Sequence, residues 1–247
     1  TGATSGIGEA LARHYSQQGA TLGLVGRRKA LLEKLQRSLK TPSFIYAIDV
    51  SEEHLFHQAI QRHIKKIGIP DIVIANAGVS TGTLNGERED LVTFKRMMDI
   101  NLYGVMHTFL PFIHAFKKRK SGQLVGIASV AGIRGLPGSG AYSASKAALI
   151  NYLESLRIEM LPFNIQVTTI APGYIKTPMT HSNPYAMPFI LEVDKAVSLF
   201  IKAIDRKEKF IIIPWQMNIV GKLMCLLPAS VWDFLAKRGP KKLRAMI

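Results

Sequence analysis

Residues 1–8 read TGATSGIG, and this stretch decides the fold. Its three glycines precede a run with the spacing of an amphipathic helix. Glycine lets the backbone turn tightly and approach a bound group, and the N-terminus of a helix attracts phosphate. The stretch therefore predicts a phosphate-binding turn. The contacts it predicts are Gly2, Thr4, Ser5, Gly6, Ile7 and Gly8.

Downstream of this turn, short aliphatic or β-branched runs alternate with longer amphipathic stretches. Such alternation is typical of repeated βα units, which build a parallel sheet. We expect an α/β fold of the Rossmann type, a doubly wound parallel sheet with helices on both faces. The predicted strands are residues 21–26, 44–48, 72–75, 123–128, 165–170 and 210–213. The predicted helices lie near residues 7–18, 29–39, 52–67, 101–118, 141–161 and 193–204.

A glycine-rich turn into a helix normally follows a strand at the centre of such a sheet. We therefore expect a strand before Thr1. Residues 1–213 are predicted to form a single dinucleotide-binding domain, and residues 214–247 an amphipathic, basic extension.

Composition limits the class of protein. Hydrophobic residues make up 47% and charged residues 20%, which is ordinary for a folded domain. Because Cys225 is the single cysteine, no intrachain disulfide can form, and a cytoplasmic setting is expected. The most apolar stretch, residues 211–227, is interrupted by polar residues and proline. The net charge of +15 favours anionic partners, but no nucleic-acid motif and no metal-ligand pattern accompanies it, so neither partner is predicted.

The strand predicted over residues 21–26 is followed directly by Arg27 and Arg28. In dinucleotide sites that bind NAD, an acidic residue at this place holds the ribose 2′-hydroxyl. A guanidinium instead binds a 2′-phosphate through charge-assisted hydrogen bonds. The two arginines therefore favour NADP(H) over NAD(H) as the cofactor.

Tyr142 and Lys146 are four residues apart, so they share one face of a predicted helix. At ~4 Å and an effective dielectric near 20, a phenolate and an ammonium attract by about 4 kcal/mol. That is up to about three pKa units, enough to move a tyrosine toward neutrality. We expect Lys146 to lower the pKa of Tyr142 so that it can exchange a proton with a carbonyl or alcohol.

Other polar residues follow strands at the same predicted edge of the sheet. Ser129 comes directly after one strand, Asn76-Ala77-Gly78 after another, and Pro172-Gly173 after the strand that follows the Tyr142 helix. Asn101 is expected to open a long helix. Each has a plain structural explanation as a cap or turn residue, but together their order and spacing favour an active site.

Over residues 1–213 the chain resembles the short-chain dehydrogenase/reductase family. The resemblance rests on residues 1–8, on Asp49-Val50 as an adenine-contacting pair, on Asn76-Ala77-Gly78, and on Pro172-Gly173 with Thr177. It implies a catalytic tetrad, and it implies cofactor contacts along the strand ends. The tetrad is Asn101, Ser129, Tyr142 and Lys146. The further cofactor contacts are Arg27, Arg28, Asp49, Val50, Asn76, Ala77, Gly78, Tyr142, Lys146, Pro172, Gly173, Ile175 and Thr177.

The resemblance also implies a mechanism. NADPH would deliver hydride to a carbonyl carbon while Tyr142 protonates the oxygen and Ser129 hydrogen-bonds it. Lys146 would bind the nicotinamide ribose, and Asn101 would position a water that feeds protons to Lys146. The family further implies a homodimer or homotetramer built on the helices near residues 101–118 and 141–161.

The extension after Pro214 combines apolar residues with six basic residues and one acidic residue, Asp233. Such a segment is compatible with peripheral contact to a membrane surface, with a cover over the substrate cleft or with a dimer interface. The apolar residues are Trp215, Met217, Val220, Leu223, Met224 and Leu227, and the basic residues are Lys222, Lys237, Arg238, Lys241, Lys242 and Arg244.

The apolar segment 184–191 and this extension favour an apolar small-molecule substrate, of the size of a lipid or steroid. Two alternatives remain open from the sequence. One is a protein that binds NADP as a sensor without turnover. The other is a membrane-associated regulatory protein.

Overall fold

The computed structural model describes residues 1–181, 183–237, 239 and 242–244. Arg238 and Lys241 of the basic extension lie outside the described residues. The main strands are all parallel, and each predicted strand is present within two residues of its expected bounds. They pair in the orders β2-β1 and β3-β4-β5-β8. Their bounds are β1 Leu22–Gly26, β2 Ser43–Ala47, β3 Ile72–Ala75, β4 Gly122–Ile127, β5 Ile165–Pro172 and β8 Phe210–Ile213.

The β1 and β3 strands belong to separate hydrogen-bonded sheets, and the glycine turn connects them. The Thr1 amino group donates to the Ile74 carbonyl at 2.7 Å, and the Ala3 amide donates to the Val25 carbonyl at 3.1 Å. An apolar cavity of about 630 Å³ is lined by residues of both strands. The strand expected before Thr1 stays a prediction, and β1 and β3 are the edges that it would join.

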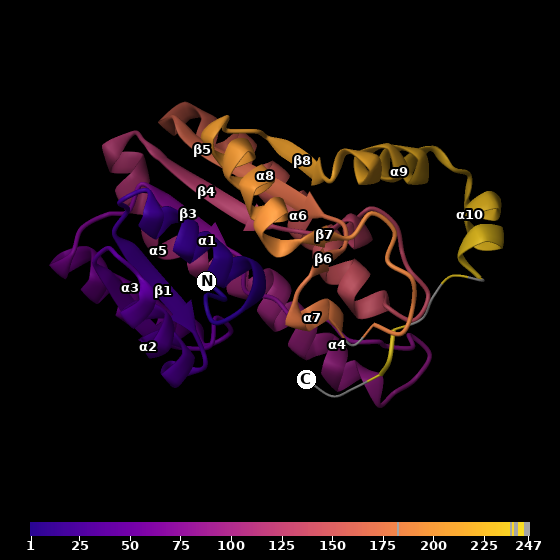
Figure 1. Ribbon diagram of the computed structural model, residues 1–247. Coiled ribbons are helices and arrows are strands. Elements are labelled where there is room, and N and C mark those ends of the chain that lie inside the picture. Colours follow the sequence, from indigo (N-terminus) through magenta and orange to yellow (C-terminus); the bar gives the residue numbers. More distant parts are fainter. Residues whose placement is uncertain (182, 238, 240–241, 245–247) are drawn as a thin grey trace.

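Helices cover both faces of the sheet, as predicted (Figure 1). One face carries α1, α2 and α8, where Leu11, Val197 and Phe200 are buried. The other carries α3, α5 and α6, where Phe56, Phe109 and many other side chains are fully buried. These helices are α1 Gly6–Gln17, α2 Lys29–Ser38, α3 Glu53–Lys66, α5 Gly104–Arg119, α6 Gly140–Met160 and α8 Val193–Asp205.

The expectation that Asn101 opens a long helix is wrong. The helix α4, Asp90–Met98, continues through a π-helical turn, Asp99–Tyr103, into α5. Asn101 therefore lies within an unbroken helical path. A π turn commonly marks a functional position because it redirects a side chain that a regular helix would place elsewhere.

Short elements complete the ligand side of the sheet. The two-residue strands β6, Ile175–Lys176, and β7, Leu191–Glu192, pair with each other, and the short helix α7, Pro178–His181, follows β6. These elements place the segment after β5 across the carboxyl ends of the strands (Figure 1).

The extension forms α9, Trp215–Leu226, and α10, Ala229–Ala236. The Arg134 side chain donates to the carbonyls of Met224 and Leu227 at 2.8 and 2.9 Å, and the Trp232 indole donates to the Gly135 carbonyl at 3.2 Å. Further on, the Gly82 amide donates to the Leu243 carbonyl at 2.8 Å. Within the described part of the chain, no helix is both long and apolar enough to cross a membrane.

Candidate active site

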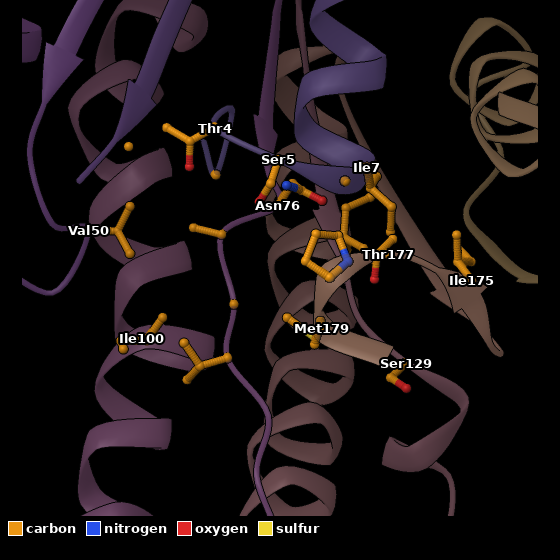
Figure 2. A pocket seen from close by; sticks show the side chains of 18 of the residues that line it. Thr4, Ser5, Ile7, Val50, Asn76, Ile100, Ser129, Ile175, Thr177 and Met179 are labelled. Atoms are coloured by element: carbon orange, nitrogen blue, oxygen red, sulfur yellow. The ribbon is translucent and has the colours of Figure 1, made fainter. Parts of the chain in front are cut away.

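The residues predicted from strand ends and turns converge on one cavity at the carboxyl edge of the sheet. Figure 2 shows Thr4 and Ser5 of the glycine turn on one side of it and Ser129 and Ile175 toward the other. Every predicted cofactor contact except Gly8 lines this cavity. Of the four predicted catalytic residues, only Asn101 does not line it.

Gly2 and Gly8 shape the turn. Gly2 has a φ of 69°, and a Cβ there would lie 2.9 Å from the Ala77 Cα. A Cβ on Gly8 would lie 2.2 Å from the Gly2 carbonyl oxygen, so Gly8 allows α1 to start directly beneath the turn. Gly8 does not line the cavity, and its visible role is therefore this close packing rather than a cofactor contact.

The first turn of α1 is open to an anion. Its N-cap residue, Ser5, makes no side-chain hydrogen bond to the helix amides, which leaves them to another acceptor. The Arg28 guanidinium donates to the hydroxyls of Thr4 and Ser5 at 2.7 and 3.1 Å. Arg28 thus brings a positive charge onto the same turn, and the exposed Arg27 lines the cavity beside it.

The Asn76-Ala77-Gly78 segment is hydrogen-bonded to the start of the glycine turn. The amides of Asn76 and Ala77 both donate to the Thr1 hydroxyl at 3.1 Å, and the Asn76 side chain donates to the Thr1 carbonyl at 3.0 Å. These bonds hold two loops, 75 residues apart in the sequence, in a fixed relation along one wall of the cavity.

Asp49 lies in a network that the sequence did not predict. Its carboxylate accepts a hydrogen bond of 2.6 Å from Arg96 of α4, whose other nitrogen donates to Ser51 at 2.7 Å. Burial tends to raise the pKa of Asp49, but hydrogen bonds from Ser51 and Arg96 outweigh it and hold that pKa below its ordinary value. Asp49 is therefore a fixed carboxylate at the adenine end of the cavity that the resemblance implies.

Ser129, Tyr142 and Lys146 meet at the opposite end. Ser129 follows β4 and caps a short 3₁₀ turn by accepting from the Ala131 amide at 3.1 Å. Lys146, one turn beyond Tyr142 on α6, is 4% exposed, and its Nζ donates to the Ile127 carbonyl at 2.8 Å. That Nζ lies 6.0 Å from the centroid of the Tyr142 ring.

The direction of the Tyr142 pKa is opposite to the expected one. Burial raises it above its ordinary value, and a hydrogen bond with Ser129 only partly opposes that effect. Burial also lowers the pKa of Lys146 from 10.5 to about 8. Burial is the largest cause of both shifts, and the Lys146 ammonium donates its hydrogen bond to a backbone carbonyl. Tyr142 is therefore protonated at neutral pH.

The Asn101 side chain hydrogen-bonds the loop that follows Gly78. Its side-chain oxygen accepts from the Val79 amide at 2.8 Å, and its nitrogen donates to the Val79 carbonyl and the Ser145 hydroxyl, both at 3.0 Å. The π turn aims this fully buried side chain between the loop and α6. Because a Cβ on Gly78 would lie 3.2 Å from Asn101 Oδ1 and 3.6 Å from Lys146 Nζ, Asn101 and Lys146 both border Gly78.

Several lining residues escaped sequence reasoning. They come from positions directly beside predicted ones and from α7, whose start just after Thr177 could have suggested them. They are Gly26, Ile48, Val79, Ile100, Ile127, Ala128, Pro178, Met179 and Thr180.

These features fit a dinucleotide. The open first turn of α1 suits a pyrophosphate, the close backbone approach at Gly2 leaves room for it, and Asp49 offers an acceptor to an amine. At the other end, Ile175 and Thr177 line the cavity together with Ser129 (Figure 2).

The comparisons with known proteins agree with this geometry. A family model described as short chain dehydrogenase matches residues 1–187, and the chain belongs to this family. An uncharacterized oxidoreductase of Myxococcus xanthus is 35% identical over 96% of this chain and 95% of its own length. An Arabidopsis thaliana protein named 11-beta-hydroxysteroid dehydrogenase-like 2 is 36% identical, over 95% of this chain and 78% of that protein.

Two solved structures resemble the whole chain. A short-chain dehydrogenase of Streptomyces avermitilis aligns with a TM-score of 0.78 at 20% identity, covering 96% of both chains. A short-chain dehydrogenase of Sphingobium yanoikuyae in complex with NADPH aligns with a TM-score of 0.75 at 25% identity, covering 95% of this chain and 89% of that one. The protein is thus an oxidoreductase of the short-chain dehydrogenase family with the corresponding dinucleotide-binding fold.

Proposed function

We propose that the protein transfers hydride between NADP(H) and a carbonyl or secondary alcohol of an apolar small molecule. The observation that carries this proposal is that Ser129, Tyr142 and Lys146 together line one end of the cavity that fits a dinucleotide. NADPH, when bound, supplies the hydride. The protein's residues must then orient the carbonyl and provide the proton.

Each catalytic side chain has one task in this proposal. Tyr142 donates its phenolic proton to the carbonyl oxygen, and Ser129 hydrogen-bonds that oxygen as negative charge develops. The Lys146 ammonium stabilises the phenolate that remains and hydrogen-bonds the ribose. Asn101 is a positioning residue, which holds the Val79 backbone and Ser145 and so fixes the loop beside Lys146.

Arg28 supports NADP(H) as the cofactor. Its guanidinium already lies on the glycine turn and has donors left for a 2′-phosphate, and Arg27 adds a second charge beside it. The bound Sphingobium yanoikuyae relative was solved with NADPH, which agrees with this choice. A 2′-phosphate would meet the Arg28 guanidinium here, beside Arg27, whose own guanidinium lies 3.6 Å from the Asp49 carboxylate.

Aromatic and apolar side chains of residues 174–190 support an apolar substrate. The rings of Tyr174 and Tyr185 contact edge to face at 6.3 Å between centroids, and Tyr142 contributes to raising the pKa of Tyr185, so the two phenols are neighbours. Phe189 and Ile190 in the same segment are 49% and 40% exposed. A lipid-like or steroid-like carbonyl compound would cover these surfaces.

We also propose a homodimer or homotetramer built on α5 and α6. Leu110 and Ile158 on these helices are 51% and 56% exposed. Contact between copies would bury them.

The test is a panel of aliphatic, steroid and aromatic carbonyl compounds, assayed by nucleotide absorbance with NADPH and with NADH. We expect oxidation of NADPH with at least one apolar ketone or aldehyde, and a weaker reaction with NADH. If the protein binds NADPH but oxidises it with no compound on the panel, the proposal of a sensor without turnover replaces this one.

A further inference from the structure

One face of α9 is apolar and open to solvent. Trp215, Ile219, Leu223 and Leu226 recur every three or four residues, so they lie on the same side of the helix. They are 68%, 50%, 56% and 79% exposed. The opposite side of α9 packs on the protein, where Met217 is buried against Gly173.

The next helix, α10, also exposes apolar side chains. Val231 and Leu235, four residues apart, are 42% and 53% exposed. Figure 1 shows α9 and α10 standing out from the body of the protein beyond β8. We call the six residues Trp215, Ile219, Leu223, Leu226, Val231 and Leu235 the C-terminal apolar surface. Several exposed apolar side chains gathered on projecting helices mark a contact with a partner or a membrane.

The charges beside this surface are mostly positive. Lys222 is exposed next to Leu223, and Lys237 follows α10 with its Nζ 5.0 Å from the centre of the Phe234 ring. Asp233 is the one carboxylate in residues 215–237, and it lies two residues from both Val231 and Leu235, on the other side of α10. The whole chain carries +15.

Exposed apolar side chains beside lysines favour one kind of partner. If two copies met through this same surface, the lysines of one would face the lysines of the other, with Asp233 as the one carboxylate of residues 215–237 on each side to pair with them. An anionic bilayer complements both features, because its acyl region accepts the apolar side chains and its headgroups attract the lysines. We propose that the C-terminal apolar surface docks into the interface of an anionic membrane, with Lys222 and Lys237 at headgroup level.

Docking would place the membrane beside the candidate active site. Gly173 lines the cavity, and a Cβ placed on it would lie 2.8 Å from the Cγ of Met217, on the inner side of α9. Gly221 approaches Ile133 on the same side. A substrate dissolved in the bilayer would therefore have a short path to Tyr142. This last step rests on the proposed function, whereas the docking itself does not.

The experiment measures flotation of the full chain with vesicles of phosphatidylcholine alone or mixed with phosphatidylglycerol, without substrate or nucleotide. The test variant is Leu223→Glu/Leu226→Glu. The matched control is Leu55→Glu/Leu161→Glu, which adds the same charge at two leucines that are 56% and 59% exposed elsewhere. Both tryptophans, Trp215 and Trp232, lie in α9 and α10, so tryptophan emission reports directly on this region.

We expect wild type and control to float with anionic vesicles, with a blue shift of tryptophan emission, and the test variant to bind at least tenfold more weakly. Lys222→Gln/Lys237→Gln should reduce binding severalfold and weaken its dependence on salt. The proposal is overturned if wild type does not float, or if test and control variants bind equally. It is also overturned if the test variant only dissociates an oligomer in sedimentation, because the surface would then be an interface between copies.

Discussion

The burial of Lys146 predicts a measurable change in the free energy of unfolding. Its ammonium is buried, and its pKa falls from 10.5 to about 8. At about 1.36 kcal/mol per pKa unit, the charged form costs the folded state about 3 kcal/mol at pH 7. Lys146→Met removes this cost but also the hydrogen bond to the Ile127 carbonyl, which is worth about 1–2 kcal/mol. The variant should therefore be about 1–2 kcal/mol more stable than wild type, and inactive.

The pH dependence separates this cause from simple packing. Between pH 8 and 10.5 the unfolded chain binds a proton at Lys146 that the folded protein does not, so the stability of wild type rises with pH in this window. Lys146→Met lacks that rise. Its advantage should shrink by about 2 kcal/mol between pH 7 and 9.5.

The assay is urea unfolding of wild type and variant at both pH values, with the exposed Lys65→Met as control. Lys65→Met should differ little from wild type and show no such trend. If Lys146→Met is less stable than wild type at pH 7, or if its advantage does not change with pH, then Lys146 is not a desolvated ammonium and the reasoning fails.

The remaining predictions concern the proposed reaction. Tyr142→Phe should lower kcat by at least a thousandfold while NADPH binding, measured by fluorescence titration, changes less than threefold; appreciable turnover would contradict its role as the acid. Arg28→Ala should raise KM for NADPH about 30-fold and leave KM for NADH within twofold, whereas equal effects on both would remove the 2′-phosphate contact. Arg96→Met should loosen Asp49 and raise KM for either nucleotide severalfold at unchanged kcat, and a fall in kcat alone would argue against a positioning role. Rates followed from pH 6 to 10 should show reduction declining as Lys146 loses its proton near pH 8; a reduction rate that does not change across this range would be inconsistent with the role of the ammonium.

The sequence predicted much of the site because of how parallel sheets are built. Strands such as β4 and β5 end at the same edge, so residues that follow them, Ser129 and Gly173, must come together whatever the loops do. The glycine turn could be predicted because its tight path depends only on the residue types of eight consecutive positions.

Arg96 could not be found in this way, and for Asn101 the sequence pointed to the residue but not to its place in the helix. Arg96 acts on Asp49 across 47 positions, and only the packing of α4 beside the strand ends brings the two together. The direction of the Asn101 side chain depends on a π turn, and such a turn has no hydrophobic period that a sequence would reveal. The side chain hydrogen-bonds Val79 and Ser145 from that turn. Both residues act through tertiary contacts, and a sequence pattern records only local ones.

The Tyr142–Lys146 pair shows why spacing alone misjudged the electrostatics. Four residues on a helix correctly placed the two groups near each other, and the expected shift counted only the attraction between them. In the fold Lys146 is 4% exposed and Tyr142 is partly buried, and burial is the largest cause of the pKa shift of each. Tyr142 consequently keeps its proton, which is the state that a general acid needs before it meets a carbonyl. The burial that makes Lys146 costly to the fold is therefore the same burial that prepares Tyr142 to donate.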